Sequence, residues 1–353
     1  MMKRLLPKAA LALTLLLSAG CETISYYGQA ARGHWDVVSR QRPSEKIIQA
    51  DNTDDELRRR LHLVEEARQF AAAHLGLKPG RHYTRYADLE RDAVVYNVFA
   101  APEFSLEPKR WWYPLIGRQS YRGFFGKNEA ITYAKSLQAE GLDVYVGGVD
   151  AYSTLGWFRD PVLNTWIDDA DEEIVALVFH ELTHQLVYVA DDTKFNEAYA
   201  TAVEIAGVRL WLRGKNDPDA LARWDAKQTR REEFTQIVKT TRARLKALYQ
   251  QTLPPEDMRQ LKAAEITALQ QQINELRERW QTPKAFASWT TKPVNNARLN
   301  TVSTYHDLVP SFLALLDQHH GDFPKFHAAV KRLGKRSKEQ RGAILETLVA
   351  SSN

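Results

Sequence analysis

Residues 175–187 read Val175-Ala176-Leu177-Val178-Phe179-His180-Glu181-Leu182-Thr183-His184-Gln185-Leu186-Val187. This stretch predicts a buried helix over residues 172–188, because apolar side chains surround a small group of polar ones. His180 and His184 are four residues apart and therefore lie on one face of that helix, about one turn from each other. Their imidazoles can bind one metal ion, and Glu181, beside the first histidine, can reach a water molecule at that ion. The pattern thus predicts a metal site in a dry cleft.

A third metal ligand is expected downstream, since a catalytic zinc ion takes three protein ligands and keeps one position open for water. Residues 194–201, Lys194-Phe195-Asn196-Glu197-Ala198-Tyr199-Ala200-Thr201, resemble the Asn-Glu-x-x-Ala element that begins the second zinc helix of gluzincin peptidases. The resemblance makes Glu197 the third ligand, at the start of a helix over residues 196–212. Glu204, seven residues later on the same face, is the alternative ligand or a partner that orients one of the histidines. The resulting prediction is one Zn2+ ion per chain, bound by His180, His184 and Glu197.

Hydrolysis of an acyl bond is the chemistry that such a site supports. Zinc lowers the pKa of its bound water towards about 7, and Glu181 can accept a proton from this water and pass it to the leaving amine. The developing oxyanion needs a further donor besides the metal, which a Tyr or His supplies in related enzymes. Residues 295–307 concentrate polar side chains before an apolar helix, so we expect Tyr305, or else His306, to be this donor, unless the stretch is only a capped helix start. Arg298 in the same stretch is a candidate for binding a substrate carboxylate.

A glycine-rich stretch upstream of the metal helix is expected to line the same cleft. Residues 147–158 read Gly147-Gly148-Val149-Asp150-Ala151-Tyr152-Ser153-Thr154-Leu155-Gly156-Trp157-Phe158. Zincins commonly bind substrate beside an edge strand near the metal, and glycines allow a ligand backbone to approach closely. Asp150 and Gly156 are therefore substrate-binding candidates. The alternative is a tight turn packed by Trp157 and Phe158.

The amino-terminal end predicts export and lipid attachment. Basic residues in the first eight positions precede a short apolar run over residues 9–17, as in a secretory signal peptide. Ser18-Ala19-Gly20-Cys21 resembles the bacterial lipoprotein processing box, with Ser18 in place of the usual Leu; a plain signal with an incidental Cys is the alternative. The resemblance implies a diacylglyceryl anchor on Cys21, which attaches a protein to a membrane without a spanning helix. Because Glu22 follows, and not the Asp that retains many lipoproteins at the inner membrane, we expect lipid anchoring in the bacterial cell envelope, at the outer membrane facing the periplasm.

The composition argues against a nucleic-acid-binding protein and against a disulfide-stabilised one. The chain has 353 residues, with 48 Lys and Arg against 44 Asp and Glu, and a net charge of +4. This balance is too near neutral to indicate nucleic-acid binding. Cys21 is the single cysteine, so an internal disulfide cannot form.

The expected fold class is α+β, mainly α. It has a small N-terminal α+β portion with a short sheet, then a zincin-like helical zinc domain and a long antiparallel helical hairpin. Hydrophobic periodicity predicts a helix over residues 53–75 and another around 130–139. Strand-forming residues occur over 93–125, notably at 93–101 and 111–113, and again at 144–146.

The carboxy-terminal half is expected to be helical. Two long charged helices, broken at Leu253-Pro254-Pro255-Glu256, form the hairpin. Its charged faces are either solvated or bind a protein partner. A final helical unit covers residues 305–349. The expected divisions are a lipoprotein signal peptide (1–20), a tether that can pack on the body (21–52), the α+β and zinc-motif catalytic domain (53–217), the hairpin (218–282) and a C-terminal helical part that completes the active-site cleft (283–353).

Over the whole mature chain, the sequence resembles the bacterial family of predicted zinc aminopeptidases, many of which are lipoproteins. The matching pieces are Gly117-Arg118, Tyr121-Arg122-Gly123, the 150–158 stretch, His180-Glu181-Leu182-Thr183-His184, Phe195-Asn196-Glu197 and Asn295-Asn296-Ala297-Arg298. The resemblance implies a zinc metallopeptidase that acts on short peptides from the amino end, and Asn296 joins the substrate-binding candidates. An aminopeptidase also needs an acid that binds the free amine of its substrate, and Asp150, Glu204 and Asp160 are candidates for this role.

Two other functions stay open. The first is an envelope endopeptidase that cuts cell-wall peptides or proteins. The second is a non-catalytic, zinc-containing assembly lipoprotein. Glu181 argues against the second function, because a purely structural zinc site needs no base.

Overall fold

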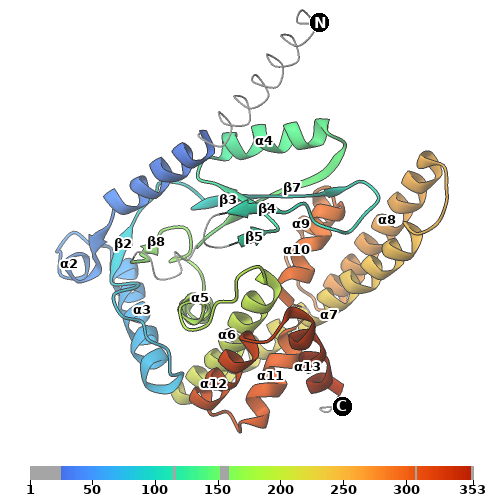
Figure 1. The fold of residues 1–353 in the computed structure, drawn as a ribbon. Coiled ribbons are helices and arrows are strands. Elements are labelled where there is room, and N and C mark those ends of the chain that lie inside the picture. The colour runs from blue at the N-terminus through green and yellow to red at the C-terminus, as the bar shows by residue number, and fades with distance from the viewer. Residues whose placement is uncertain (1–24, 114–116, 152–158, 307, 351–353) are drawn as a thin grey trace, which may run out of the picture.

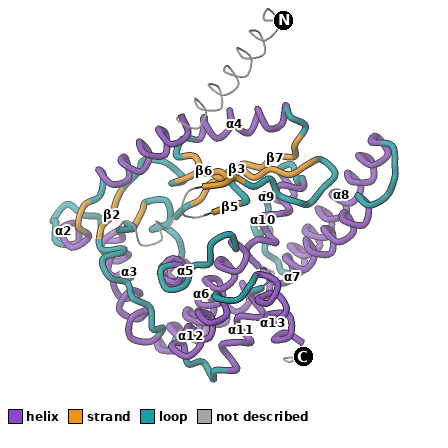
Figure 2. The backbone as a smooth tube through the Cα atoms, viewed as in Figure 1, coloured by secondary structure: helices purple, strands orange, loops and turns teal. Residues whose placement is uncertain are grey.

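The computed structural model describes residues 25–113, 117–151, 159–306 and 308–350, without the side chains of residues 303–306 and 349–350. Helices dominate this part of the chain and the strands form small sheets, which confirms the α+β, mainly α class (Figures 1 and 2). Cys21 and Gly156 lie outside the described residues.

The amino-terminal segment is more ordered than the expected tether. Residues 25–39 are helical, and β1 (Arg42–Pro43) and α2 (Ser44–Ile48) follow. Val37 is 1% exposed and Ile47 is 5% exposed, and both belong to the main hydrophobic core. Residues 25–48 therefore pack as part of the body, because they carry apolar side chains that the core buries.

Helix α3 (Asp55–His74) follows and agrees with the helix predicted over residues 53–75. The side chain of Asp54 caps it by accepting hydrogen bonds from the backbone N–H groups of Glu56 and Leu57.

The central sheet has the order β6 (Arg122–Phe124), β3 (Val95–Pro102) and β7 (Leu142–Val149), with antiparallel neighbours. Helix α4 (Lys127–Ala139) covers one face of it (Figure 1). The strands predicted at 93–101 and 144–146 and the helix predicted around 130–139 are confirmed. The buried residues between helix and sheet include Val98, Ala100, Ala134, Leu137 and Val144.

Two smaller sheets complete the strand portion. Strand β4 (Trp111–Tyr113), as predicted, pairs with β5 (Gly117–Gln119). Strand β2 (Arg85–Ala87) lies between β1 and β8 (Val162–Leu163).

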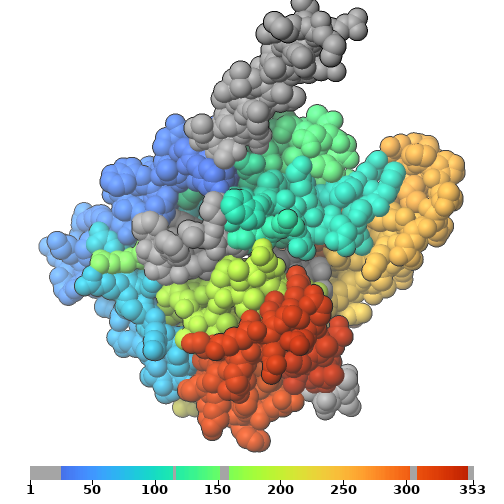
Figure 3. Space-filling model, viewed as in Figure 1, coloured from blue at the N-terminus to red at the C-terminus, as the bar shows by residue number. Residues whose placement is uncertain are grey.

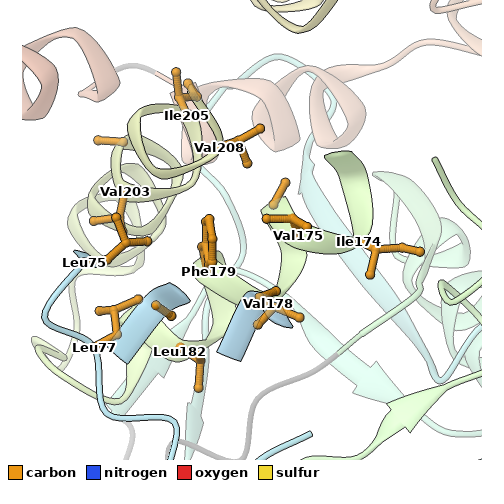
Figure 4. Packing of buried hydrophobic residues seen from close by; sticks show 14 of the residues in the cluster. Leu75, Leu77, Ile174, Val175, Val178, Phe179, Leu182, Val203, Ile205 and Val208 are labelled. Carbon is orange, nitrogen blue, oxygen red and sulfur yellow. The ribbon is translucent and has the colours of Figure 1, made fainter. Parts of the chain in front are cut away.

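Helices α5 (Asp171–His184) and α6 (Thr193–Lys215) carry the metal-binding motif. Helix α5 buries one side against α3 and α6, with Val175, Phe179 and Leu182 in the main core (Figure 4). Acidic residues fill its first turn, where the helix dipole favours negative charge. The two histidines predicted to bind metal therefore lie on a helix whose opposite side is fixed by close packing.

The predicted hairpin consists of α7 (Pro218–Leu248) and α8 (Pro255–Arg279). Both helices begin with proline, and the start of the second at Pro255 was predicted. Figure 3 shows the hairpin as the yellow to orange arm at the side of the molecule. Buried apolar side chains, among them Phe234, Val238, Leu269 and Ile273, join its two helices.

The carboxy-terminal part is helical, as expected, but its helices begin before residue 305. Its helices are α9 (Ser288–Thr291), α10 (Asn296–His306), α11 (Val309–Gln318), α12 (Phe323–Gly334) and α13 (Lys338–Ala350). The polar stretch expected before a helix is itself α10, which packs against α6, β3 and β7. Among the described residues, no helix has the length and apolar character that crossing a membrane requires.

Candidate metal centre

Three side chains from α5 and α6 bring their ligand atoms to one point. Nε2 of His180 lies 3.2 Å from Nε2 of His184. Oε2 of Glu197 lies 3.4 Å from the first of these nitrogens and 3.7 Å from the second. The three side chains are between 8% and 15% exposed, so the point is largely shielded from solvent. Within the described part of the chain, this is the group of His, Cys, Asp and Glu residues whose arrangement suits a metal ion.

The spacing of these atoms fits zinc. Two ligand atoms bound at about 2.0–2.1 Å in tetrahedral geometry lie about 3.3–3.4 Å apart. The three observed separations of 3.2, 3.4 and 3.7 Å lie close to this value. Two imidazole nitrogens and a carboxylate oxygen are also the donor set of many catalytic zinc sites. His180, His184 and Glu197 would therefore hold the ion, and a fourth position would stay open.

The connection between α5 and α6 makes this arrangement possible. Helix α5 ends at His184, not at residue 188 as expected, because the chain turns immediately after it. The side chain of Asn196 holds the turn: its amide donates to the carbonyl of Val189 at 2.8 Å and its oxygen accepts from the N–H of Val189 at 2.8 Å. The early turn leaves room for α6 to begin at Thr193 and to bring Glu197 back beside the histidines.

The first turn of α6 is also fixed from the carboxy terminus. Asp192 caps the helix by accepting from the N–H of Phe195. The guanidinium of Arg341, on α13, donates to the same carboxylate at 2.6 and 3.2 Å, and both side chains are buried.

Glu204, the alternative ligand, lies on the other side of the His180 ring. Its Oε2 is 3.0 Å from Nδ1 of His180, which faces away from the metal point. Its Oε1 is 3.3 Å from a guanidinium nitrogen of Arg231, on α7. Glu204 therefore contacts the far side of the His180 ring and does not belong to the group of three.

The charges at the site form a tightly coupled set. Burial alone would lower the pKa of His180, but its hydrogen bonds to Glu197 and Glu204 outweigh burial and raise this pKa well above its usual range. Burial would raise the pKa of Glu197, but the neighbouring His184 and His180 hold it far below its usual range. The negative potential that favours a proton on His180 also favours a divalent cation.

Glu181 lies next to His180 on α5, as predicted. Burial raises the pKa of Glu181, and the nearby charges of Glu197 and Asp160 act in the same direction, whereas the two histidines oppose them. A raised pKa makes this carboxylate a better proton acceptor than an ordinary glutamate.

Asn296 and Arg298, two residues predicted to bind substrate, instead form hydrogen bonds inside the protein. Asn296 is fully buried, and its side chain bonds the carbonyls of Pro102 and Glu103 and the hydroxyl of Tyr249. It therefore joins α10 to the end of β3 and to the hairpin, and its polar atoms are occupied.

Arg298 is 2% exposed. Its guanidinium donates to the carbonyl of Pro293 and to the hydroxyl of Ser288, and it packs over the rings of Trp289 and Tyr145. The expectation that Asn296 and Arg298 contact substrate does not agree with this burial, which follows from α10 being an interior helix.

The three candidate acids for a substrate amine lie in different places. Glu204 is taken by His180 and Arg231. Asp150 follows β7 and lies near Asp169, at the opposite end of α5 from the histidines. Asp160 is buried, hydrogen-bonded to His82 at 3.2 Å, and close enough to Glu181 to affect its pKa.

Gly156 cannot be placed, since it lies in the 152–158 segment outside the described residues. Tyr305 and His306 end α10, and their side chains are likewise outside the described part.

Tyr121 and Arg231 are two further residues near the site for which the sequence alone indicated no role. Tyr121 follows β5, and Gln119 at the end of that strand bonds the hydroxyls of Tyr188 and Thr193 beside the metal helices. Burial and then the charge of Glu197 raise the pKa of Tyr121, with a further contribution from Glu181, so its hydroxyl stays protonated. Tyr121 belongs to Tyr121-Arg122-Gly123, one of the stretches that resemble the aminopeptidase family, and could have been noticed there. Nothing in the sequence pointed to Arg231, because its partner Glu204 is 27 residues away.

Comparison with known families agrees with this geometry. Searches of curated proteins and of solved structures found no match. The model of a family described as "Putative aminopeptidase" matches residues 25–345, which is most of the chain and includes both metal helices, the hairpin and α12. The chain therefore belongs to this aminopeptidase family.

Proposed function

We propose that this protein is a zinc-dependent aminopeptidase that hydrolyses short peptides and carries one zinc ion per chain. The convergence of Nε2 of His180, Nε2 of His184 and Oε2 of Glu197 on one point is the observation that carries the proposal. Membership of an aminopeptidase family supports it independently.

Bound zinc supplies a Lewis acid that polarises a carbonyl and lowers the pKa of a water ligand to about 7. Glu181, next to His180, takes the proton of the attacking water on its carboxylate and returns it to the nitrogen of the leaving amine. Its burial suits this work, because a raised pKa brings the carboxylate closer to the pH at which it must both accept and donate.

A hydrogen-bond donor to the developing oxyanion completes the catalytic set. Tyr305 was the expected donor. Tyr121 is the donor favoured by the described residues, because it interacts electrostatically with both Glu181 and Glu197 and its hydroxyl stays protonated.

Aminopeptidase activity further needs a negative charge that binds the free amine of the peptide. Of the three acids we propose Asp160, because its charge acts on Glu181 beside the metal point. The substrate amine would have to displace His82, whose ring lies 3.2 Å from the Asp160 carboxylate.

Lipid attachment through Cys21, at the bacterial outer membrane facing the periplasm, remains part of the proposal. It rests on the signal-like residues 1–20 and the processing-box resemblance around Cys21. Metabolic labelling with a radioactive fatty acid tests it, because the Cys21→Ser variant should lose the label that the native protein retains.

The decisive experiment for the activity is the digestion of a mixed peptide library, read by mass spectrometry, with and without a zinc chelator. Stepwise removal of first residues that the chelator abolishes and added zinc restores is the expected result. Internal cleavage would instead favour an envelope endopeptidase, and cleavage that survives zinc removal would refute zinc dependence.

A further inference from the structure

We propose that Arg231, on the hairpin helix α7, is a positioning residue for the metal site: it holds Glu204 so that Glu204 orients His180. The inference rests on the proposed zinc site and extends it to an element that comes later in the chain. It also gives the hairpin a part in metal binding.

A continuous chain of contacts leads from the hairpin to the metal point. A guanidinium nitrogen of Arg231 lies 3.3 Å from Oε1 of Glu204. The other oxygen, Oε2, lies 3.0 Å from Nδ1 of His180. The opposite ring nitrogen of His180 is one of the three converging ligand atoms. One oxygen of the Glu204 carboxylate therefore contacts Arg231, and the other contacts His180.

The geometry of His180 depends on its contact with Glu204. When Nδ1 carries the proton and donates it to Glu204, Nε2 keeps its lone pair for the metal. The terminal torsion of a glutamate is broad, so a single hydrogen bond leaves the carboxylate plane free to rotate. Arg231 binds the second oxygen and restrains this rotation. Glu204 is 12% exposed, so little water is present to take over the task of the guanidinium.

Arg231 is itself held in place. Oε1 of Gln228, one turn earlier on α7, accepts from the same guanidinium nitrogen at 3.4 Å, and Gln228 is buried. Lys227, next to Gln228, forms an ion pair with Glu173 on α5. This turn of α7 is therefore fastened to both metal helices, to α5 through Lys227 and to α6 through Arg231.

A double-mutant cycle on zinc affinity tests the inference. The dissociation constant of zinc would be measured on the full chain by competition with a chromogenic chelator. Glu204→Gln should weaken zinc binding by about 10–100-fold, and Arg231→Met by up to about 10-fold. Because Arg231 acts through Glu204, the double variant should bind zinc no more weakly than Glu204→Gln alone. Arg223→Met, which removes an exposed arginine from the same helix, should leave the affinity unchanged.

Arg231→Lys gives a second variant that keeps the charge without the planar guanidinium, and it should recover part of the lost affinity. Thermal unfolding of the metal-free proteins distinguishes this positioning role from a merely structural one. If Arg231 had only a structural role, its variants would unfold at a lower temperature but bind zinc as tightly as the native protein. Unchanged zinc affinity in both Arg231 variants, or fully additive losses in the double variant, would overturn the inference while the zinc site stands. Failure of the native protein to bind zinc would overturn the proposed function as well.

Discussion

Two glutamates of helix α6 contact the two ring nitrogens of His180. Glu197 and Glu204 are seven residues apart on α6 and therefore lie on the same side of it. Glu197 faces Nε2 of His180 at 3.4 Å, and Glu204 faces Nδ1 at 3.0 Å, so the imidazole ring lies between the two carboxylates. Sequence spacing alone left open which of them would bind a metal ion, and the side of the ring that each contacts favours Glu197.

The Glu197→Ala variant should lose zinc. It removes one of three ligands, so we expect the zinc content of the purified protein to fall from about one ion per chain to nearly none. Atomic absorption spectroscopy measures this content. Normal zinc content in Glu197→Ala, with loss in Glu204→Ala, would transfer the ligand role to Glu204.

The Glu181→Gln variant should separate metal binding from catalysis. The amide keeps the size of the side chain but cannot accept a proton, so turnover should fall by about 10²–10⁴-fold while zinc content stays normal. Steady-state kinetics and metal analysis of the same preparation provide the two readings. Glu172→Gln, in the first turn of the same helix, should retain activity. Full turnover in Glu181→Gln with zinc bound would count against a glutamate base.

The Tyr121→Phe variant tests the proposed oxyanion donor. Loss of one such donor costs about 10²–10³-fold in kcat, and we expect this loss with little change in KM, because the hydrogen bond forms mainly in the transition state. Tyr86→Phe, a tyrosine away from the metal helices, is the control. An unchanged kcat in Tyr121→Phe would make Tyr305 the preferred candidate for the oxyanion donor.

The two histidines, Glu181 and Glu197 were predictable because local rules determine them. Four-residue spacing on a helix and a short return to a second helix bring the ligands together. Arg231 and Tyr121 come from separate elements, and only tertiary packing places them near the site. The burial of Asn296 and Arg298 could not be predicted either, because their polar groups bond partners from other parts of the chain inside the protein.

At the scale of elements, the connection between α5 and α6 decides whether the ligands meet. Asn196 bonds both backbone groups of Val189, so Asn196→Ala leaves the part-buried N–H of Val189 without this partner, whereas the carbonyl still accepts from the N–H of Asp192. An unsatisfied buried group costs about 1–3 kcal/mol, and for this one part-buried group we expect a loss of about 1–2 kcal/mol in the free energy of unfolding together with weaker zinc binding. Urea denaturation measures the first quantity. Asn128→Ala, an exposed change on α4, should cost little, and equal stability of Asn196→Ala and the native protein would contradict this account.

The long helices α3, α7 and α8 were predictable from periodicity, capping residues and prolines. The end of α5 was not, because residues 185–188 continue the apolar pattern, and a side chain further along the chain closes the turn. Packing of the 21–52 tether on the body was allowed for, but its helices were not predicted, because the burial of Val37 and Ile47 depends on a core built by later elements.

At the scale of the whole molecule, His327 joins distant segments and should make stability depend on pH. The side chain is buried; Nε2 donates to the carbonyl of Leu75 at 2.7 Å, and Nδ1 lies 2.7 Å from the hydroxyl of Tyr199. Burial lowers the pKa of His327, and the bond to Leu75 offsets only part of this effect. Helices α12, α6 and the end of α3 thus meet at a neutral histidine.

The sign of the pH effect follows from proton binding. As the pH falls below about 6.5, the unfolded chain takes up a proton at this residue before the folded protein does. The free energy of unfolding should therefore fall with acidity, by up to about 1.4 kcal/mol per pH unit from this group. Denaturation at pH 7.5 and 5.5 in the presence of a chelator measures the change. His327→Gln should reduce this pH dependence of stability. His62→Gln, a change at an exposed histidine, should leave it unchanged. If His327→Gln showed the same pH dependence as the native protein, the assignment to His327 would be refuted.

The buried pair of Asp192 and Arg341 joins residues that are 149 positions apart. The ribosome therefore adds the arginine that fixes the first turn of α6 long after it has added His180, His184 and Glu197. A chain still in synthesis has all three of these side chains before this support exists. The turn that carries Glu197 is thus held in its final position only after α13 has been made.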